Sequence, residues 1–308
     1  MKQLTMETTI LKGKEVTQQH YEIGLIPDAK NFEMEVINLY PQKSYQTIEG
    51  FGAALTESAG YALSRMSGEN FDRVVQACYG EGGLGYTLGR VHMDSCDFSL
   101  ENYCAVSNPD DPGFGDFSLE RDARYVQPLV KKVFAAAGKP VSLLLSPWSP
   151  PAFMKETGVR NGGGHLKPEC YQAYADYIVR YLKEYEKAGI PIRFMTVQNE
   201  PLAVQTWDSC EYTPEEEKTF LRDFLYPALQ ENGLGHVGIY IWDHNKERVY
   251  ERTRDIVDET TKNMIEGVAY HWYSGDHFET LSMVREDSPD LKLMHSEGCV
   301  ELARFGEE

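Results

Sequence analysis

Two glutamates that follow apolar runs are the side chains with which this sequence could do chemistry. Glu200 follows the run at residues 194–197, whose apolar and β-branched residues are typical of a buried strand, and a proline comes next. A proline has no N–H to donate to a β-ladder, so the strand must end there with the carboxylate at its carboxyl end. Glu297 follows a second run, at residues 291–294. Two carboxylates suit the cleavage of a glycosidic bond, because one can protonate the leaving oxygen while the other attacks the anomeric carbon or activates water.

Polar and aromatic side chains follow the other predicted strands at the same point. Tryptophan rings can stack on the apolar faces of sugars, and Asp, Asn and His side chains can bind sugar hydroxyl groups. We therefore predict a sugar-binding pocket, although the sequence leaves open whether Trp242, Asp243 and His244 line it or belong to the core. The residues at or just after the carboxyl ends of the predicted strands are Glu49, Phe51, Arg90, Asp94, Cys96, Asp97, Phe98, Ser146, Trp148, Asn199, Trp242, Asp243, His244, Asn245, His271, Trp272, Tyr273, His295 and Ser296.

The elements that must position these side chains alternate between strands and helices from residue 45 onward. Helices are predicted from about residue 55, at 121–137, at 169–188 and from Thr213, which is followed by a proline and two acidic residues. This alternation predicts a parallel sheet with right-handed crossovers. Polar residues after nearly every strand favour a (β/α)8 TIM barrel over a doubly wound sheet. The predicted strands are 46–51, 86–91, 141–145, 194–197, 237–242, 268–270 and 291–294.

The two ends of the chain depart from this pattern. Residues 1–44 alternate polar and apolar side chains, which predicts N-terminal β strands that need a partner to cover their apolar face. After the seventh predicted strand only residues 299–308 remain, too few for another strand and helix. We therefore predict an α/β chain in which residues 45–308 form a TIM barrel truncated after strand 7, lacking the eighth β/α unit.

Composition excludes several other classes of protein. The chain has 308 residues, of which 42% are hydrophobic, and a formal net charge of −18, which argues against nucleic acid or an anionic membrane as the main partner. None of the six cysteines forms a C-x-x-C pair, and no zinc-protease or P-loop motif occurs, so we expect no metal and no cofactor. The glycine-rich residues 161–164 follow no strand and are predicted to be a loop. No apolar run is long enough to span a membrane, and the N-terminus lacks the apolar core of a signal peptide. We expect a cytoplasmic protein, or a secreted one if a leader was removed.

Several motifs, in order, resemble those of one enzyme family. They are Ser-Pro-Trp-Ser-Pro-Pro-Ala-Phe-Met-Lys at 146–155, Val-Gln-Asn-Glu-Pro at 197–201, Trp-Asp-Ser-Cys at 207–210, His-Trp-Tyr at 271–273 and Ser-Glu-Gly-Cys at 296–299. The segment 50–57 is similar to the opening strand and helix of the same family. From about residue 45 to its end the chain resembles glycoside hydrolase family 30, most closely the branch that contains glucosylceramidase.

The resemblance implies a retaining mechanism on a barrel fused to a β-sandwich, of which residues 1–44 would be a part. It implies that Glu200 is the general acid/base, that Glu297 is the nucleophile, and that Trp207 lies near the aglycone. We expect Arg90 to support the site by pairing with a carboxylate. The family has an eighth strand and most of its sandwich after the nucleophile, so a fragment is expected. The residues implied to contact the glycone are Asp97, Trp148, Asn199, His271 and Tyr273.

The leading hypothesis is a retaining β-glycosidase that acts on β-glucosides, with glucosylceramide as the family's best-matched substrate. Its partner would be a carbohydrate or glycolipid, with no nucleic acid and no integral membrane association. A β-1,6-glucanase or β-xylosidase of the same family is an alternative within the enzyme class. A truncated chain that binds carbohydrate without catalysis is the alternative outside it.

Overall fold

The computed structural model describes residues 3–13, 15–25, 38–111 and 113–299. The chain divides into two compact units, Met1–Ile48 and Glu49–Glu308, where the sequence predicted a boundary between residues 44 and 45. Each unit is described by itself below.

The first unit contains a hairpin of two antiparallel strands, β1 (Gln3–Lys12) and β2 (Glu15–Gly24). Lys12 lies opposite Glu15, and the ladder runs from there to the pair Gln3 and Gly24. Most side chains of both strands are exposed. The alternating pattern that the sequence shows at residues 32–36 lies outside the described residues.

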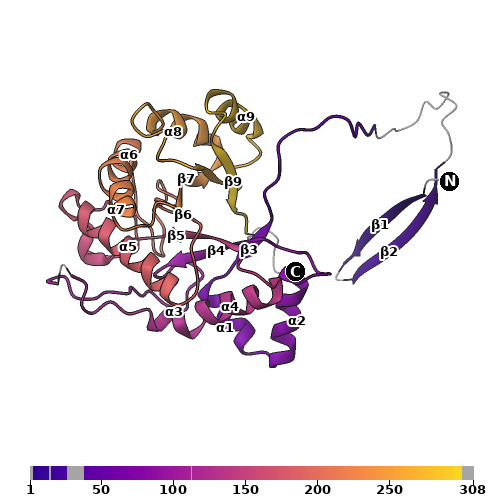
Figure 1. Ribbon diagram of the computed structural model, residues 1–308, viewed down its shortest axis with the longest axis horizontal. Coiled ribbons are helices and arrows are strands. Elements are labelled where there is room, and N and C mark those ends of the chain that lie inside the picture. The colour runs from indigo at the N-terminus through magenta and orange to yellow at the C-terminus, as the bar shows by residue number, and fades with distance from the viewer. Residues whose placement is uncertain (1–2, 14, 26–37, 112, 300–308) are drawn as a thin grey trace. The chain divides into compact units, whose positions relative to one another are not determined.

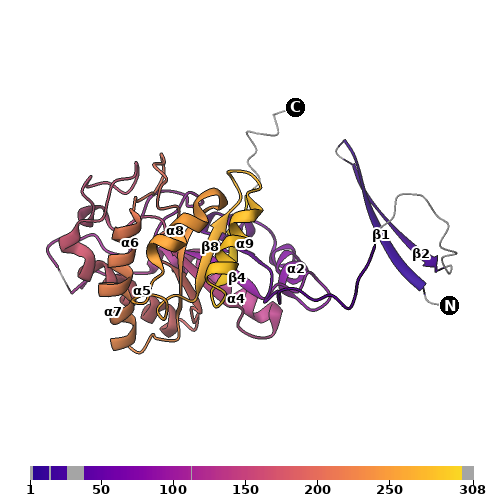
Figure 2. The same cartoon turned by 90° about the horizontal axis from the view of Figure 1, so that it is seen from above.

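Within the described residues, the second unit is built on a seven-stranded parallel sheet whose strands follow one another in chain order (Figures 1 and 2). This order confirms the predicted barrel topology, because each crossover returns the chain to the next position in the sheet. The strands are β3 (Gly52–Ala54), β4 (Leu88–Met93), β5 (Ser142–Pro147), β6 (Phe194–Thr196), β7 (Gly238–Asn245), β8 (Gly267–His271) and β9 (Lys292–Glu297).

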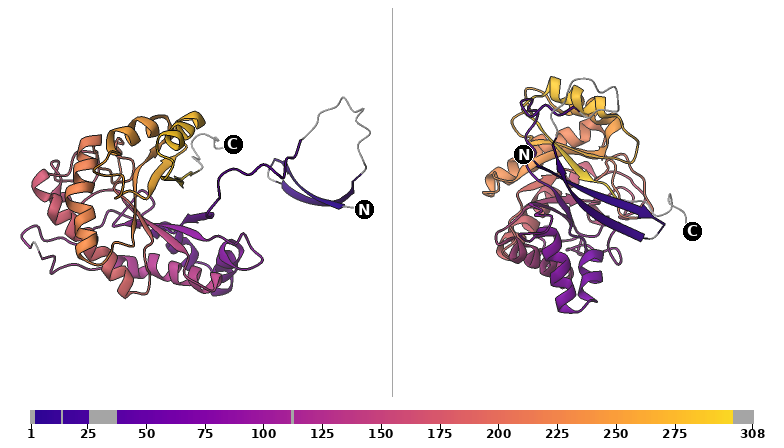
Figure 3. Two further views of the ribbon diagram at one scale, coloured as in Figure 1. Left: turned by 45° about the horizontal axis from the view of Figure 1, so that its top comes forward. Right: turned by 90° about the vertical axis from the view of Figure 1, so that its right-hand side faces the viewer.

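Helices run round the outside of this sheet, from α1 and α2 at one end to α8 and α9 at the other (Figure 3, left). The α-helices are α1 (Glu57–Ser64), α2 (Gly68–Tyr79), α3 (Glu120–Arg124), α4 (Val126–Ala137), α5 (Tyr171–Lys187), α6 (Pro214–Phe220), α7 (Tyr226–Glu231), α8 (Val249–Ile256) and α9 (Phe278–Asp287). The short helices are η1 (Ala152–Met154), η2 (Pro168–Cys170), the π-helical η3 (Leu221–Leu225) and η4 (Lys246–Arg248). The helix predicted at 121–137 is therefore two helices, separated at Tyr125.

Helix α5 shows how the core between helices and sheet is formed. Its tyrosines recur at helical spacing, and Tyr174, Tyr177, Tyr181 and Tyr185 are fully buried. Their rings contact one another, with Tyr181 stacked on Tyr185 at a centroid distance of 5.2 Å. Such rings bury about 150–250 Å² each, which makes this face a major part of the core. The helix ends at Lys187, one residue before the predicted end, and Gly189 follows with a φ of +79° that suits glycine.

The position predicted for the first strand of the sheet was wrong. Residues 46–51 were predicted to be a strand, but β3 begins at Gly52 and is three residues long. The backbone of Gly52 lies so close to β4 that a Cβ would be 2.1 Å from the carbonyl oxygen of Leu88. Glycine is therefore required where β3 enters the sheet, although glycine usually argues against a strand.

Five other strands end later than predicted, and the two longest extensions, in β7 and β9, matter for the site. The prediction ended them at the last apolar residue, but β7 continues to Asn245 and β9 to Glu297. A bulge in β7 between Trp242 and His244 interrupts its pairing with β8. Polar side chains of these extensions bond to residues of other strands, Asp243 and Glu297 to Arg90 of β4 and Ser296 of β9 to Asp243 of β7.

Strands β3 and β9 are the two edges of the sheet, and within the described residues they do not pair with each other. They nevertheless approach, because Lys292 at the start of β9 contacts Glu49, just before β3, at 3.0 Å. The sheet is thus curled like an open barrel (Figure 1). Among the helices of the described residues, none is both long and apolar enough to cross a membrane.

Candidate active site

The carboxyl ends of the strands bring the predicted residues to one place, with Arg90 of β4 at the centre. Its guanidinium donates to Ser146 Oγ at 3.1 Å, to Asn199 Oδ1 at 2.8 Å and to Asp243 Oδ2 at 2.8 Å. It also forms an ion pair with Glu297. Burial alone would lower the pKa of Arg90, but the two carboxylates raise it, so the side chain stays charged. Arg90 therefore ties the ends of five strands together.

Glu297, at the end of β9, is held as a carboxylate. One oxygen pairs with Arg90, and the other accepts a hydrogen bond from the Tyr273 hydroxyl at 2.9 Å. Burial would raise the pKa of Glu297, but Arg90 and His271 lower it below its ordinary value. The same Tyr273 oxygen accepts the backbone N–H of Cys299 at 3.0 Å, which fixes the phenol ring. Glu297 is thus ionised at neutral pH.

Glu200 leaves β6 on a backbone turn with a φ of +47°. Its N–H donates to the carbonyl oxygen of Asp243 at 3.0 Å, which fixes this conformation. Asp94, Trp242 and Asp243, at the ends of β4 and β7, also have positive φ. Such conformations are costly for residues other than glycine and concentrate at functional sites. Here they direct side chains from the strand ends toward one another.

His271, at the end of β8, lies between two carboxylates. Its Nε2 is 3.0 Å from Asp243 Oδ1, and its Nδ1 is 3.0 Å from Glu200 Oε1. Burial alone would lower the pKa of His271, but the hydrogen bonds to Asp243 and Glu200 raise it to about 9. Both ring nitrogens therefore donate at neutral pH. Asp243 is fully buried, yet Arg90 and His271 hold its pKa far below the ordinary value.

Of the remaining residues that the resemblance implied, Trp148 and Asp97 lie at the site, whereas Trp207 lies beside it. Trp148 is buried, with its ring 4.7 Å from the guanidinium of Arg90. Asp97 is exposed at the mouth, where partial burial and then Glu297 raise its pKa to about 6. Trp207 is 39% exposed, and its indole donates no hydrogen bond within the described residues. Trp242 belongs to the core, whereas Asp243 and His244 line the site, which answers the question left open by the sequence.

A model of the glycosyl hydrolase family 30 TIM-barrel domain matches residues 48–307. The chain belongs to glycosyl hydrolase family 30. The predicted resemblance is thereby confirmed, and the open barrel described above is the fold of this family domain.

Similar proteins in this family include glucosylceramidases and a glucanase. The chain is 32% identical to putative glucosylceramidase 4 of Caenorhabditis elegans, covering 83% of this chain and 52% of that protein. It is 30% identical to lysosomal acid glucosylceramidase of Mus musculus, covering 86% and 54%. The crystal structure of SrfJ from Salmonella typhimurium matches with a TM-score of 0.87 at 39% identity, covering 92% and 63%. The endo-β1,6-glucanase BT3312 matches with a TM-score of 0.73 at 29% identity, covering 83% and 58%. The chain spans about half the length of the curated relatives it matches.

A buried network that the sequence did not reveal joins three loops of this family 30 site. Arg160 donates to Asp208 Oδ1 at 2.6 Å and approaches Asp94 Oδ2 at 3.4 Å, and Ser95 Oγ donates to the same Asp208 oxygen at 3.0 Å. Lys155 adds hydrogen bonds to the carbonyl oxygens of Arg160 and Ser209. The partners are distant in sequence, so the only signal was an arginine directly before the glycine-rich loop.

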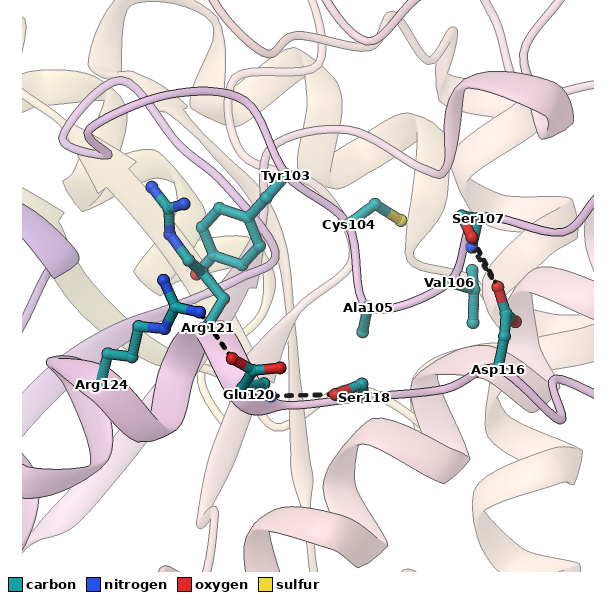
Figure 4. Close-up of a pocket in the computed structure, with 10 residues that line it drawn as sticks. All are labelled: Tyr103, Cys104, Ala105, Val106, Ser107, Asp116, Ser118, Glu120, Arg121 and Arg124. Atoms are coloured by element: carbon teal, nitrogen blue, oxygen red, sulfur yellow. Dashed lines mark hydrogen bonds and ion pairs between the residues drawn. The ribbon is translucent and has the colours of Figure 1, made fainter.

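A hollow of about 290 Å³ lies beside α3, and its lining includes neither Glu200 nor Glu297 (Figure 4). Its two arginines are already paired, Arg121 with Glu57 and Glu101, and Arg124 with Glu120. The hollow therefore offers no unpaired cation to an anionic ligand among the residues that line it. We assign no chemistry to it.

Proposed function

We propose that this chain carries the site of a retaining β-glycosidase that acts on β-glucosides. The observation that carries the proposal is the position of His271, whose Nδ1 is 3.0 Å from Glu200 Oε1 and 4.0 Å from Glu297 Oε1. Both carboxylates thus face one small space, which is compatible with the separation of about 5–5.5 Å that retention requires.

Glu297 is the proposed nucleophile. Its lowered pKa keeps it ionised, and Arg90 and Tyr273 hold both of its oxygens in place. A carboxylate oxygen forms a bond to the anomeric carbon while the bond from that carbon to the leaving oxygen breaks. The product of this step is a glycosyl ester of Glu297.

Glu200 is the proposed general acid and then general base. Its Oε1 contacts His271, while its other carboxylate oxygen accepts no hydrogen bond within the described residues. That second oxygen is free to give a proton to the leaving oxygen. In the second step Glu200 takes a proton from water, the water oxygen attacks the anomeric carbon, and Glu297 leaves.

The glucosylceramidase relatives support a β-glucoside as the substrate. In this proposal Asp97, Trp148 and Asn199 bind the glycone, and the exposed Trp207 lies toward the aglycone. The likeness to an endo-β1,6-glucanase supports β-1,6-glucan as a second candidate.

The test is hydrolysis of a chromogenic β-glucoside by the whole chain and its variants. Glu200→Gln should lower kcat about 10²–10⁴-fold, and Glu297→Ala should abolish turnover. Glu251→Ala, which removes an exposed glutamate of α8, serves as the matched control and should leave kcat at the wild-type value. Wild-type turnover in Glu297→Ala would show that the nucleophile is assigned wrongly.

Two further measurements separate the alternatives. Comparing a lipid-linked glucoside with short β-1,6-glucans distinguishes a glucosylceramidase from a glucanase, since each should hydrolyse its own substrate faster. Calorimetry with the same ligands addresses the remaining case. Heat of binding without hydrolysis would favour a chain that binds carbohydrate without catalysis.

A further inference from the structure

The proposed acid/base Glu200 and two histidines next to it present the donor set of a transition-metal site. Glu200, His244 and His271 each offer one ligand atom, and these atoms all lie within 4.8 Å of one another. We propose that they bind one divalent cation of the zinc class, and that this cation inhibits glycoside hydrolysis. The proposal that the cation binds rests on the three side chains alone. The proposal that it inhibits hydrolysis rests on the proposed function.

The distances from the Glu200 oxygen to the two histidine nitrogens fit such an ion. Glu200 Oε1 is 3.0 Å from His271 Nδ1 and 3.7 Å from His244 Nδ1. Tetrahedral zinc with bonds of about 2.0–2.1 Å to nitrogen and oxygen places neighbouring donor atoms roughly 3.3 Å apart. The two separations lie on either side of that value, so small rotations of the side chains would suffice.

His271 is already oriented as a ligand. Its Nε2 faces Asp243 Oδ1 at 3.0 Å, which directs Nδ1 toward Glu200. A carboxylate on the far nitrogen is the arrangement that fixes the ring of metal-binding histidines. Asp243 is itself held by Arg90 and Ser296, so this orientation is rigid. A bound cation would take the place of the proton on Nδ1.

His244 supplies the second, independent observation. Its Nδ1 is buried and has no hydrogen-bond partner within the described residues. The distance of 3.7 Å to Glu200 is too long for a hydrogen bond. The ring is held in this position by Trp242, at a centroid distance of 5.1 Å. A buried nitrogen without a partner is costly, and coordination of a cation would remove that cost.

The donor set also selects the kind of cation and explains its effect. Two imidazoles and one carboxylate suit zinc, copper or nickel rather than magnesium or calcium, which prefer oxygen ligands. Three protein ligands leave a fourth position for water. Coordination occupies Glu200, which can then no longer carry the proton for the leaving oxygen, so hydrolysis stops.

The test begins with calorimetry of zinc chloride against the whole chain after treatment with a chelator. We expect one zinc per chain, and at least tenfold weaker binding in both His244→Asn and His244→Gln. His236→Asn, which removes an exposed histidine paired with Glu186, is the control and should bind like wild type. Cobalt(II) gives a second readout, because its visible absorption reports four-coordinate binding and should be lost with His244. Absence of zinc binding, or equal binding by the His244 and His236 variants, would overturn the site.

Inhibition by the cation is tested on the chromogenic β-glucoside. Zinc should inhibit wild type, a chelator should restore full activity, and at least tenfold more zinc should be needed to inhibit His244→Asn. Zinc that binds without slowing hydrolysis would overturn the inhibition. Activity that a chelator diminishes would also overturn it, since the cation would then serve the reaction. If the chain hydrolyses no glucoside, the proposed function fails, whereas the calorimetry still decides whether the metal site exists.

Discussion

The charge of His271 makes the stability of the folded chain depend on pH. Burial alone would lower its pKa, but Asp243 and Glu200 raise it from 6.5 to about 9. The folded state therefore binds this proton more tightly than the unfolded chain does. The stabilisation is complete below about pH 6.5 and is lost as the pH rises through about 9. We expect this proton to contribute at most roughly 3 kcal/mol to the free energy of unfolding.

Urea denaturation across that pH window measures the effect. In wild type the free energy of unfolding should fall between about pH 6.5 and about pH 9, and in His271→Asn this part of the slope should disappear. His236→Asn, in an exposed position, should keep the wild-type slope. An unchanged slope in His271→Asn would mean that other groups cause the pH dependence.

At the scale of single residues, the sequence predicted the side chains that follow apolar runs. Glu200 and Glu297 were found in this way, because a carboxylate at the end of a buried strand has a defined place. The part played by Asp243 stayed open, since only its contacts with Arg90 and His271 distinguish a site residue from a core residue. Arg160 was missed for the same reason, because its carboxylate partner lies 48 residues away in the chain.

At the scale of elements, Arg160 joins the loop after β4 to the loop that carries Trp207. Both Arg160 and Asp208 are buried, with exposed fractions of 7% and 2%. Replacing Arg160 by methionine leaves the Asp208 carboxylate without its cation in the interior. Loss of one partner of a buried pair costs about 3–5 kcal/mol, so we expect a loss of stability in that range.

Hydrogen exchange shows whether Arg160 stabilises the two loops in particular or the second unit as a whole. In Arg160→Met, hydrogen exchange at the amides of residues 95–105 and 205–211 should accelerate relative to wild type. Exchange at the amides of α5 should accelerate less. The control is Arg124→Met, which removes an exposed arginine that pairs with Glu120 on the surface. Equal acceleration throughout the second unit would contradict a specific link between the two loops.

A substitution at Gly52 tests whether the first strand, β3, needs a glycine where it approaches β4. A Cβ at Gly52 would lie 2.1 Å from the carbonyl oxygen of Leu88, and backbone atoms cannot rotate away. We expect Gly52→Ala to lower the free energy of unfolding by at least about 1–3 kcal/mol. Gly68→Ala is the matched control, because no atom lies within 4 Å of its Cβ. In helix α2 the Gly68→Ala change should leave the free energy of unfolding unchanged or raise it by up to about 1 kcal/mol. Similar denaturation midpoints for the Gly52 and Gly68 variants would contradict the prediction.

The same glycine shows where element boundaries can and cannot be predicted. The extent of α5 was predicted to within two residues at each end, as 169–188 against Tyr171–Lys187, because the signals that define a helix are local in sequence. The start of β3 could not be predicted, since the need for Gly52 comes from the nearby backbone of β4. The ends of β7 and β9 were placed too early because their polar side chains are stabilised by other strands.

At the scale of the whole molecule, strand order could be predicted from two features together. The alternation of strands and helices indicated a parallel sheet, and the polar residues after nearly every strand favoured a barrel over a doubly wound sheet. The number of parallel strands was predicted as well, since within the described residues the sheet has the seven that were counted. The contact between Lys292 and Glu49 could not be predicted, because it depends on how far the sheet curls.

The hairpin of the first unit supplies the last prediction. Its register places Leu4 opposite Ile23 and Met6 opposite Tyr21, so these four apolar side chains share one face. A two-stranded hairpin cannot bury such a face by itself. We expect Leu4→Lys combined with Ile23→Lys to lower the binding of a fluorescent hydrophobic dye to the chain, because the lysines interrupt the apolar face.

The opposite face of the same hairpin provides the control. Thr5 and Glu22 form a cross-strand pair there, so Thr5→Lys combined with Glu22→Lys adds the same lysines without touching the apolar face. Dye binding should stay at the wild-type level in this control, while near-ultraviolet circular dichroism should be unchanged in both double variants. Equal loss of dye binding in the two variants would assign the effect to charge, and no loss in either would place the dye site outside the hairpin.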